Sequence, residues 1–138
     1  MIEKTLLIIK PDAIKKRKIG AILDIIESNG FDVIELKMFH MDRSMAQQLY
    51  AIHEGKPYYE KLIDFMIASK VVAVILKREN AITKLRSIVG NTDPAVAPMG
   101  TIRHIYGNTV TYNAVHAADS PKNANEEIAI VFPELNRS

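Results

Sequence analysis

Two continuous apolar runs constrain the fold of this chain more than any other feature. Residues 5–9 read Thr-Leu-Leu-Ile-Ile and end at Lys10-Pro11, and residues 71–76 form a second run between polar ends. Apolar runs of this length, without alternating polar residues, are typical of strands that are buried in a sheet. We therefore predict two buried strands, with residues 71–76 in a central position.

Five further segments carry apolar residues at helical spacing. Asn29-Gly30 ends the first of them, because these residues adopt the left-handed conformation that follows many helices. Ser44 with Gln47 predicts a capping box at the start of the second, and Ser120-Pro121 predicts a cap and a first-turn proline for the last. The predicted helices are 19–29, 44–53, 59–66, 82–89 and one that begins after Ser120.

Residues 34–39 alternate between apolar and polar, which is the two-residue period of a strand, and residues 109–115 are rich in β-formers. Between 91 and 107 the pattern weakens, and prolines and glycines predict a long loop with a short helical turn. The order is β-α-β-(α-α)-β-α-β-α. With helices packed on one face, this order predicts an α+β fold: a ferredoxin-like βαββαβ four-stranded antiparallel sheet with additional helices.

Composition excludes several classes of function. The net charge of the 138 residues is only +2, which argues against a general nucleic-acid or membrane binder. The chain has no cysteine, so disulfides and thiolate metal sites are excluded. The first apolar run is too short to be a signal peptide or to span a bilayer, and we expect a cytoplasmic protein.

The segment from Asn113 to Ser120 places a single histidine, His116, at the end of a β-like run and just before a capped helix. A histidine held by a strand on one side and open on the other is well placed as a nucleophile that accepts and then releases a group. His40, His53 and His104 have no supporting motif, and we assign them no role.

A site that handles phosphate would have to be built from side chains. The chain lacks both the GxxxxGK[ST] phosphate loop and the GxGxxG turn. Lys10, Arg86, Thr92 and Arg103 lie at predicted strand ends or in loops, where they can converge on a polyphosphate. For any one of them alone, an ordinary surface residue is the favoured reading, because solvated Lys and Arg are the rule.

Several short motifs occur along nearly the whole chain. They are Ile9-Lys10-Pro11-Asp12, Lys56-Pro57-Tyr58-Tyr59, Arg86 with Gly90-Asn91-Thr92-Asp93-Pro94, Gly100-Thr101-Ile102-Arg103, and residues 113–120. In order and in spacing, these motifs resemble those of nucleoside diphosphate kinase. The resemblance implies a single domain of this type over residues 1–138.

The resemblance implies an enzyme that works by a ping-pong reaction. A nucleoside triphosphate would give its terminal phosphoryl group to His116, which would pass it to a nucleoside diphosphate. In the remaining positions, Arg86, Thr92 and Arg103 match phosphate-binding residues. Lys10 and Asn113 match residues that contact the sugar, and Lys10 also lies near the transferring group. Tyr58 matches a ring that stacks on the base, and Tyr50 and Glu127 match neighbours of the reactive histidine.

Three of these positions have a plain structural alternative. Without the resemblance, Tyr58 equally fits an aromatic side chain that packs on the core, and for Tyr50 the core-facing reading is favoured over a catalytic one. Glu127 equally fits an ordinary carboxylate on a helix. A non-catalytic nucleotide-binding module on the same fold is the main rival reading, and a structural or nucleic-acid-interacting protein has little support from the charge pattern.

Cofactor and partners follow from the same resemblance. We expect Mg²⁺ to be bound mainly through the nucleotide phosphates rather than in a cage of protein ligands. We expect a homo-oligomer, with tetramer and hexamer both open and the loop around Pro94 as one contact region. We expect neither a membrane nor a nucleic acid as a partner.

The chain departs from the family pattern next to the reactive histidine. Ala117 and Ala118 stand where the family usually has glycine and serine, and the missing serine hydroxyl would normally bond the carboxylate that matches Glu127. We therefore expect a modestly slower or less stable phosphohistidine step. Met99 and His104 replace a usual proline and a usual glycine, which affects the loop more than the chemistry.

Overall fold

The two continuous apolar runs form the inner strands of a four-stranded antiparallel sheet. In the computed structural model, which describes residues 1–136, β1 (Ile2–Ile9) pairs with β3 (Lys70–Glu79). β2 (Asp32–His40) pairs with β3, and β4 (Val115–Ala117) pairs with β1, so the strand order is β2-β3-β1-β4. The predicted ferredoxin-like α+β sheet is confirmed.

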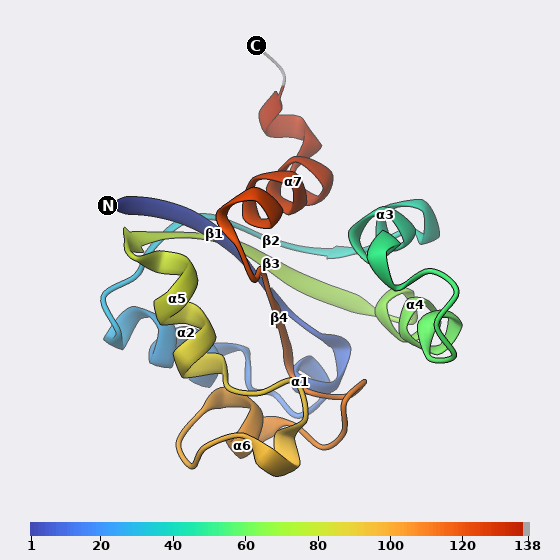
Figure 1. Cartoon of the computed structure of the whole chain (residues 1–138), viewed down its shortest axis with the longest axis horizontal. Coiled ribbons are helices and arrows are strands. Elements are labelled where there is room, and N and C mark those ends of the chain that lie inside the picture. The colour runs from blue at the N-terminus through green and yellow to red at the C-terminus, as the bar shows by residue number, and fades with distance from the viewer. Residues whose placement is uncertain (137–138) are drawn as a thin grey trace.

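Helices cover both faces of this sheet, not one face as predicted (Figure 1). In β1, Leu6 and Ile8 face one layer of helices, and Leu7 and Ile9 face the other. This double burial explains why the run has no polar alternation. One layer contains α3 (Arg43–Leu49), α4 (Tyr59–Ile67) and α7 (Pro121–Val131); the other contains α1 (Pro11–Lys15), α2 (Ile19–Ser28), α5 (Ala81–Val89) and α6 (Ile102–Tyr106).

The edge strand β2 leaves much of its apolar surface uncovered. Ile34, Leu36 and Met38 are 41%, 48% and 48% exposed, and only one side of the strand is paired with β3. The alternating pattern was therefore a correct signal for a strand. It gave no information about which protein surface, if any, covers these side chains.

Helix boundaries agree with the capping signals except at α3. Asn29 ends α2, Gly90 ends α5, and the Ser120 hydroxyl accepts the backbone N–H of Asn123 at the start of α7. The predicted capping box at Ser44 is wrong. Asp42 is the cap and accepts the N–H of Met45, and after α3 the chain makes a 3₁₀ turn, Ala51–His53.

The last strand is shorter than predicted, because residues 109–114 do not join the sheet. Asn108 and Thr109 donate their N–H groups to the Tyr112 carbonyl, which closes a turn inside the β-rich segment. Ala114 then has a φ of 75°, which interrupts extended backbone. The predicted loop at 91–107 contains a 3₁₀ turn, Pro94–Val96, and the short helix α6.

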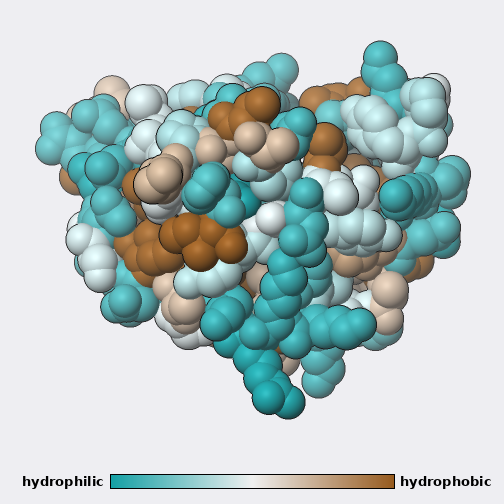
Figure 2. All heavy atoms as spheres, turned by 90° about the horizontal axis from the view of Figure 1, so that it is seen from below, coloured by the Kyte–Doolittle hydropathy of each residue, from teal (hydrophilic) through white to brown (hydrophobic). Residues whose placement is uncertain are grey.

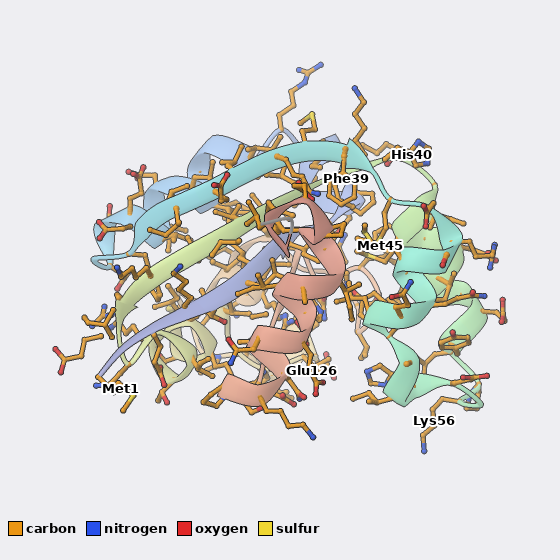
Figure 3. All side chains as sticks on the ribbon, turned by 90° about the horizontal axis from the view of Figure 1, so that it is seen from above. Met1, Phe39, His40, Met45, Lys56 and Glu126 are labelled. Atoms are coloured by element: carbon orange, nitrogen blue, oxygen red, sulfur yellow. The ribbon has the colours of Figure 1, made fainter. Side chains whose placement is uncertain are left out.

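Within the part of the chain that the structure describes, none of the helices is both long and apolar enough to cross a bilayer. Seen from the side that carries α6, the surface is hydrophilic over most of its area, with separate apolar patches (Figure 2). On the opposite side, α7 lies beside α3 and α4 in front of the sheet (Figure 3).

Candidate active site

A cavity of about 350 Å³ lies between β4, α7, the α3–α4 pair and the loop before β4. All nine site residues expected from the sequence line this one cavity, although they come from segments more than 100 positions apart. They are Lys10, Tyr50, Tyr58, Arg86, Thr92, Arg103, Asn113, His116 and Glu127.

His116 is held at the cavity wall by its strand and by a carboxylate. Its backbone pairs with Ile8 of β1, and its Nε2 lies 2.6 Å from Oε1 of Glu127 on α7. Both side chains are mostly buried, at 16% and 14% exposed. An ionised carboxylate only accepts hydrogen bonds, so Nε2 carries the proton and Nδ1 of the neutral ring keeps its lone pair.

Tyr50 packs edge-on against the same ring. The two ring centroids are 5.4 Å apart and the ring planes are at 88°. Burial raises the pKa of the Tyr50 phenol, and the nearby Glu127 adds to this effect, so the hydroxyl stays protonated. Within residues 1–136 this buried hydroxyl has no hydrogen-bond partner, which leaves it as a donor beside the cavity.

Lys10 and Asn113 form a buried pair at the base of the cavity. The Lys10 ammonium donates to the Asn113 side-chain oxygen at 2.8 Å and to the Thr111 carbonyl at 3.1 Å. Asn113 in turn donates to the Thr92 carbonyl at 3.0 Å. Burial and, after it, the positive charge of Arg103 together lower the pKa of Lys10 to about 8. An anion bound in the cavity would therefore stabilise the charged form of this amine.

Arg103 is buried and bridges two backbone segments. Its guanidinium donates to the Gly90 carbonyl at 3.0 Å and to the Val115 carbonyl, next to His116, at 2.9 Å. Burial, followed by repulsion from Arg86, lowers the pKa of Arg103 to about 10. Among the described residues the Nε–H of Arg103 is buried without an acceptor. Two close arginines with a free donor form a site that favours an anion.

Gly90 allows the backbone to pass close to Thr101. It has a φ of 89°, and a Cβ at this position would lie 2.6 Å from the Thr101 hydroxyl oxygen. Glycine avoids both the strained conformation and the clash. The carbonyl of this motif glycine is the one that accepts from the Arg103 guanidinium.

The backbone before His116 is strained and held from both sides. Ala114 has a positive φ, its N–H donates to Asp12 Oδ2 at 3.0 Å, and its carbonyl accepts the N–H of Lys10 at 2.9 Å. A non-glycine residue in this region costs about 1–3 kcal/mol, so the surrounding contacts must enforce it. The turn aims the Asn113 side chain inward, where it is 2% exposed.

Sequence reasoning missed His53, which also lines the cavity. Its Nδ1 lies 2.5 Å from the Tyr58 hydroxyl, and burial followed by the neighbouring His116 lowers its pKa. The three-residue spacing from Tyr50 was an available signal, since it is the spacing of neighbours on a helical turn. Val110 and Asn123 are further lining residues that no motif had indicated, and Asp119 lines the cavity from the 113–120 motif without an assigned role.

The two unusual alanines occupy different surroundings. Ala117 is half-buried and pairs with Leu7 across β1 and β4. Ala118 is 1% exposed and packs in a small apolar cluster with Ile82 and Ala124. Glu127 reaches His116 directly despite the missing hydroxyl, so that one contact is made without it.

Comparison with known proteins identifies the family of the chain. The family model described as nucleoside diphosphate kinase matches residues 3–136. The chain is 45% identical over 132 residues to a nucleoside diphosphate kinase of Helicobacter pylori, with 96% of each chain covered. It is 41% identical over 134 residues to the corresponding protein of Methanocaldococcus jannaschii, with 97% of this chain and 96% of that one covered.

Solved structures show the same relationship. The nucleoside diphosphate kinase of Aquifex aeolicus superposes with a TM-score of 0.92 at 40% identity, covering 98% of both chains. The enzyme of Halobacterium salinarum, solved in complex with CDP, gives a TM-score of 0.92 at 32% identity, covering 96% of this chain and 88% of that one. By sequence and by fold, the chain belongs to the nucleoside diphosphate kinase family of enzymes.

Proposed function

We propose that this protein transfers the terminal phosphoryl group of a nucleoside triphosphate to a nucleoside diphosphate through a phosphohistidine at His116. The observation that carries the proposal is the state of the imidazole. Its Nε2–H is tied to Glu127, and its Nδ1 is left as the nucleophile in a cavity with Lys10, Arg86 and Arg103. A nucleophile oriented by a hydrogen-bonded carboxylate beside cations suits phosphoryl transfer.

In the first half-reaction, the Nδ1 lone pair attacks the terminal phosphorus. The bond from phosphorus to the bridging oxygen breaks, its electron pair stays on that oxygen, and the nucleoside diphosphate leaves. The ring becomes positively charged, and the Glu127 carboxylate stabilises it. In the second half-reaction an oxygen of the acceptor diphosphate attacks the same phosphorus, the P–N bond breaks, and its electron pair returns to Nδ1.

The remaining site residues are assigned to binding and alignment. Arg86, Thr92 and Arg103 would hold the phosphates, and the unpaired Nε–H of Arg103 is a donor available to them. Preorganised donors of this kind stabilise the charge that spreads over the transferring group. Lys10 and Asn113 would contact the sugar, and Lys10 would also balance charge near the reacting phosphorus.

Tyr58 supports a broad choice of base. It lies at the cavity wall and is 42% exposed, so its ring is accessible to a planar ligand. Stacking reads only the π-face, which every base offers. We assign Tyr58 to base stacking and Tyr50, which is buried against His116, to supporting the imidazole.

We propose that Mg²⁺ enters together with the nucleotide, bound mainly through its phosphates. Three cationic side chains line the cavity, so a divalent cation fits there only when phosphate oxygens accompany it. Mg²⁺ commonly keeps several waters and binds through substrate phosphates in this way. When bound, it would supply neutralisation of the phosphate charge.

Incubation with γ-labelled ATP and magnesium tests the function. We expect a label on the protein that is acid-labile and alkali-stable, and that is released on addition of a nucleoside diphosphate. His116→Asn should abolish it, whereas the matched control His104→Asn, on the exposed side of α6, should retain it. Nucleotide binding without any label would instead identify a non-catalytic binding module, and a label that persists in His116→Asn would refute the assignment.

We also propose a homo-oligomer. Beyond the family resemblance, support comes from β2, where Ile34, Leu36 and Met38 expose apolar surface along an unpaired sheet edge. Exposed apolar edges of this kind usually mark an interface. Light scattering should give a mass above that of the monomer, and Leu36→Glu should lower it. A monomer in the wild type would contradict the proposal.

For cellular location, we propose the cytoplasm. The absence of cysteine is compatible with a reducing compartment. Fractionation of cells that express a tagged chain tests this location. Recovery of the protein in a secreted or membrane fraction would contradict it.

A further inference from the structure

His53 and Tyr58 are joined by a hydrogen bond at the mouth of the cavity. The Tyr58 hydroxyl oxygen lies 2.5 Å from Nδ1 of His53, and the two rings meet at 60° with centroids 5.4 Å apart. Both side chains line the cavity. The bond therefore links the ring assigned to base stacking with a histidine that no role yet explains.

His53 is itself braced by the buried part of the site. Its backbone N–H donates to the Tyr50 carbonyl at 2.9 Å, and its ring centroid lies 6.2 Å from that of Tyr50. Tyr50 is 5% exposed and packs against His116. A series of contacting rings thus runs from the nucleophile at the interior to Tyr58 at the surface.

Tyr58 has little else to hold its ring. It is 42% exposed and is the N-cap residue of α4, but its side chain makes no hydrogen bond to the backbone of that helix. An exposed aromatic side chain samples several rotamers, and fixing it when a ligand stacks on it costs conformational entropy. A bond that fixes the ring beforehand removes part of that cost.

We propose that His53 is a positioning residue that acts through Tyr58. By holding the Tyr58 hydroxyl, it fixes the ring at the cavity mouth in the orientation that stacks on a nucleotide base. This inference rests on the function proposed above and assigns a new residue to substrate binding. Because the hydroxyl is hydrogen-bonded to His53, the base contacts only the π-face of Tyr58.

The hydrogen bond is suited to this role because it tolerates a change of charge. A tyrosine hydroxyl can donate to the bare Nδ1 of a neutral imidazole and can accept from the Nδ1–H of a charged one. The orientation of Tyr58 is therefore retained in either protonation state of His53. The link supplies position rather than a proton.

Kinetics of four variants test the proposal. Tyr58→Phe keeps the stacking ring and removes the hydroxyl; His53→Phe keeps a ring and removes Nδ1. We expect each to raise the KM for nucleotides roughly 2- to 10-fold, as the loss of one hydrogen bond implies, with the effect on KM rather than on kcat. The double variant should be no worse than either single one. His53→Asn, whose amide can replace Nδ1, should restore the lower KM.

A probe without a base distinguishes positioning of Tyr58 by His53 from a direct contact between His53 and phosphate. Inorganic tripolyphosphate should inhibit the wild type, Tyr58→Phe and His53→Phe with the same inhibition constant, because it never meets the Tyr58 ring. Weaker inhibition of His53→Phe would mean that His53 contacts phosphate directly and would overturn the proposal. Additive losses in the double variant would overturn it as well.

Failure of this inference is distinguishable from failure of the proposed function. Wild-type protein that forms no labelled phosphohistidine sinks the function itself. If the wild-type protein forms the label but the His53 and Tyr58 substitutions raise the KM additively, only the positioning role is refuted. Circular dichroism melting of each variant identifies any that fail to fold, and the His53→Asn rescue then carries the test.

Discussion

Nε2 of His116 lies 2.6 Å from Oε1 of Glu127, so a hydrogen bond at the cavity wall joins strand β4 to helix α7. This one contact decides which ring nitrogen is protonated. It also places a negative charge where the imidazole would become positive in the phosphoryl transfer proposed above. This contact and the residues around it lead to five testable predictions.

Glu127→Ala should slow phosphohistidine formation roughly 10- to 100-fold, because the buried Nε2–H loses its acceptor and the ring loses its orientation. Glu127→Gln should be milder, since the amide oxygen can still accept. Rapid-quench labelling with γ-labelled ATP measures the step. Glu126→Gln, one position earlier on α7 and exposed, is the matched control and should label normally. Equal rates in Glu127→Ala and wild type would refute the role.

Lys10 should produce an alkaline limb in the pH profile. Burial lowers its pKa to about 8, so in the free protein the amine loses its charge as the pH rises past this value. We expect kcat/KM to fall above pH 8, because neutral Lys10 no longer attracts the nucleotide phosphates. Bound phosphates favour the charged amine, so kcat should fall only at higher pH. A flat kcat/KM up to pH 9.5 would contradict this.

The same lysine should make folding stability depend on pH. Its folded pKa lies below the ordinary 10.5, so between about pH 8 and 10.5 the unfolded state binds more protons than the folded state. The contribution of Lys10 to stability therefore increases as the pH rises through this window. Urea unfolding at both ends of the window measures it. Lys10→Met should lack this increase; an identical dependence in the variant would exclude Lys10 as its source.

Gly90→Ala should destabilise the fold and lower activity together. The added Cβ would lie 2.6 Å from the Thr101 hydroxyl oxygen in a backbone conformation that alanine rarely adopts, which costs on the order of 1–3 kcal/mol before any clash. Because the Gly90 carbonyl holds Arg103, nucleotide binding should weaken as well. Thermal unfolding and nucleotide titration measure the two effects.

Gly20→Ala is the matched control for that change. Gly20 lies in α2, and a Cβ there meets nothing within 4 Å. Alanine should therefore stabilise the helix by about 0.5–1 kcal/mol. If Gly90→Ala were as harmless as Gly20→Ala, the close approach of the backbone at Gly90 would be irrelevant to stability.

Ala118→Ser should raise turnover by supplying a hydroxyl that bonds the Glu127 carboxylate. Ala118 is buried beside Ile82 and Ala124, so a hydroxyl that found no acceptor there would cost about 1–3 kcal/mol of stability. The measurement is steady-state turnover together with urea unfolding. Ala124→Ser, in the same cluster, is the control and should lose stability without any gain in turnover. Unchanged turnover in Ala118→Ser would show that the hydroxyl is dispensable.

The errors in the sequence predictions arise where the local sequence pattern is compatible with more than one structure. The strand predicted at 109–115 shrank to Val115–Ala117 because Ala114 takes a positive φ that Asp12 and Lys10 enforce from distant positions. Helices cover both faces of the sheet, whereas one face was predicted. Hydrophobic periodicity indicates that a segment is a helix, but it does not specify on which face of the sheet that helix packs. Asp42 rather than Ser44 caps α3, because both residues fit a cap and local pattern cannot choose between them.

The amino-acid sequence by itself determined the inner strands, most helix ends and the family motifs, since these depend on local periodicity, glycine and proline, and the order of a few residues. Tertiary structure alone decided that His116 presents Nδ1, that Arg103 is anchored on the Gly90 and Val115 carbonyls, and that His53 holds Tyr58. These are contacts between side chains that rotate freely in the unfolded chain. Their partners are settled only when the sheet and its two helix layers close around the cavity.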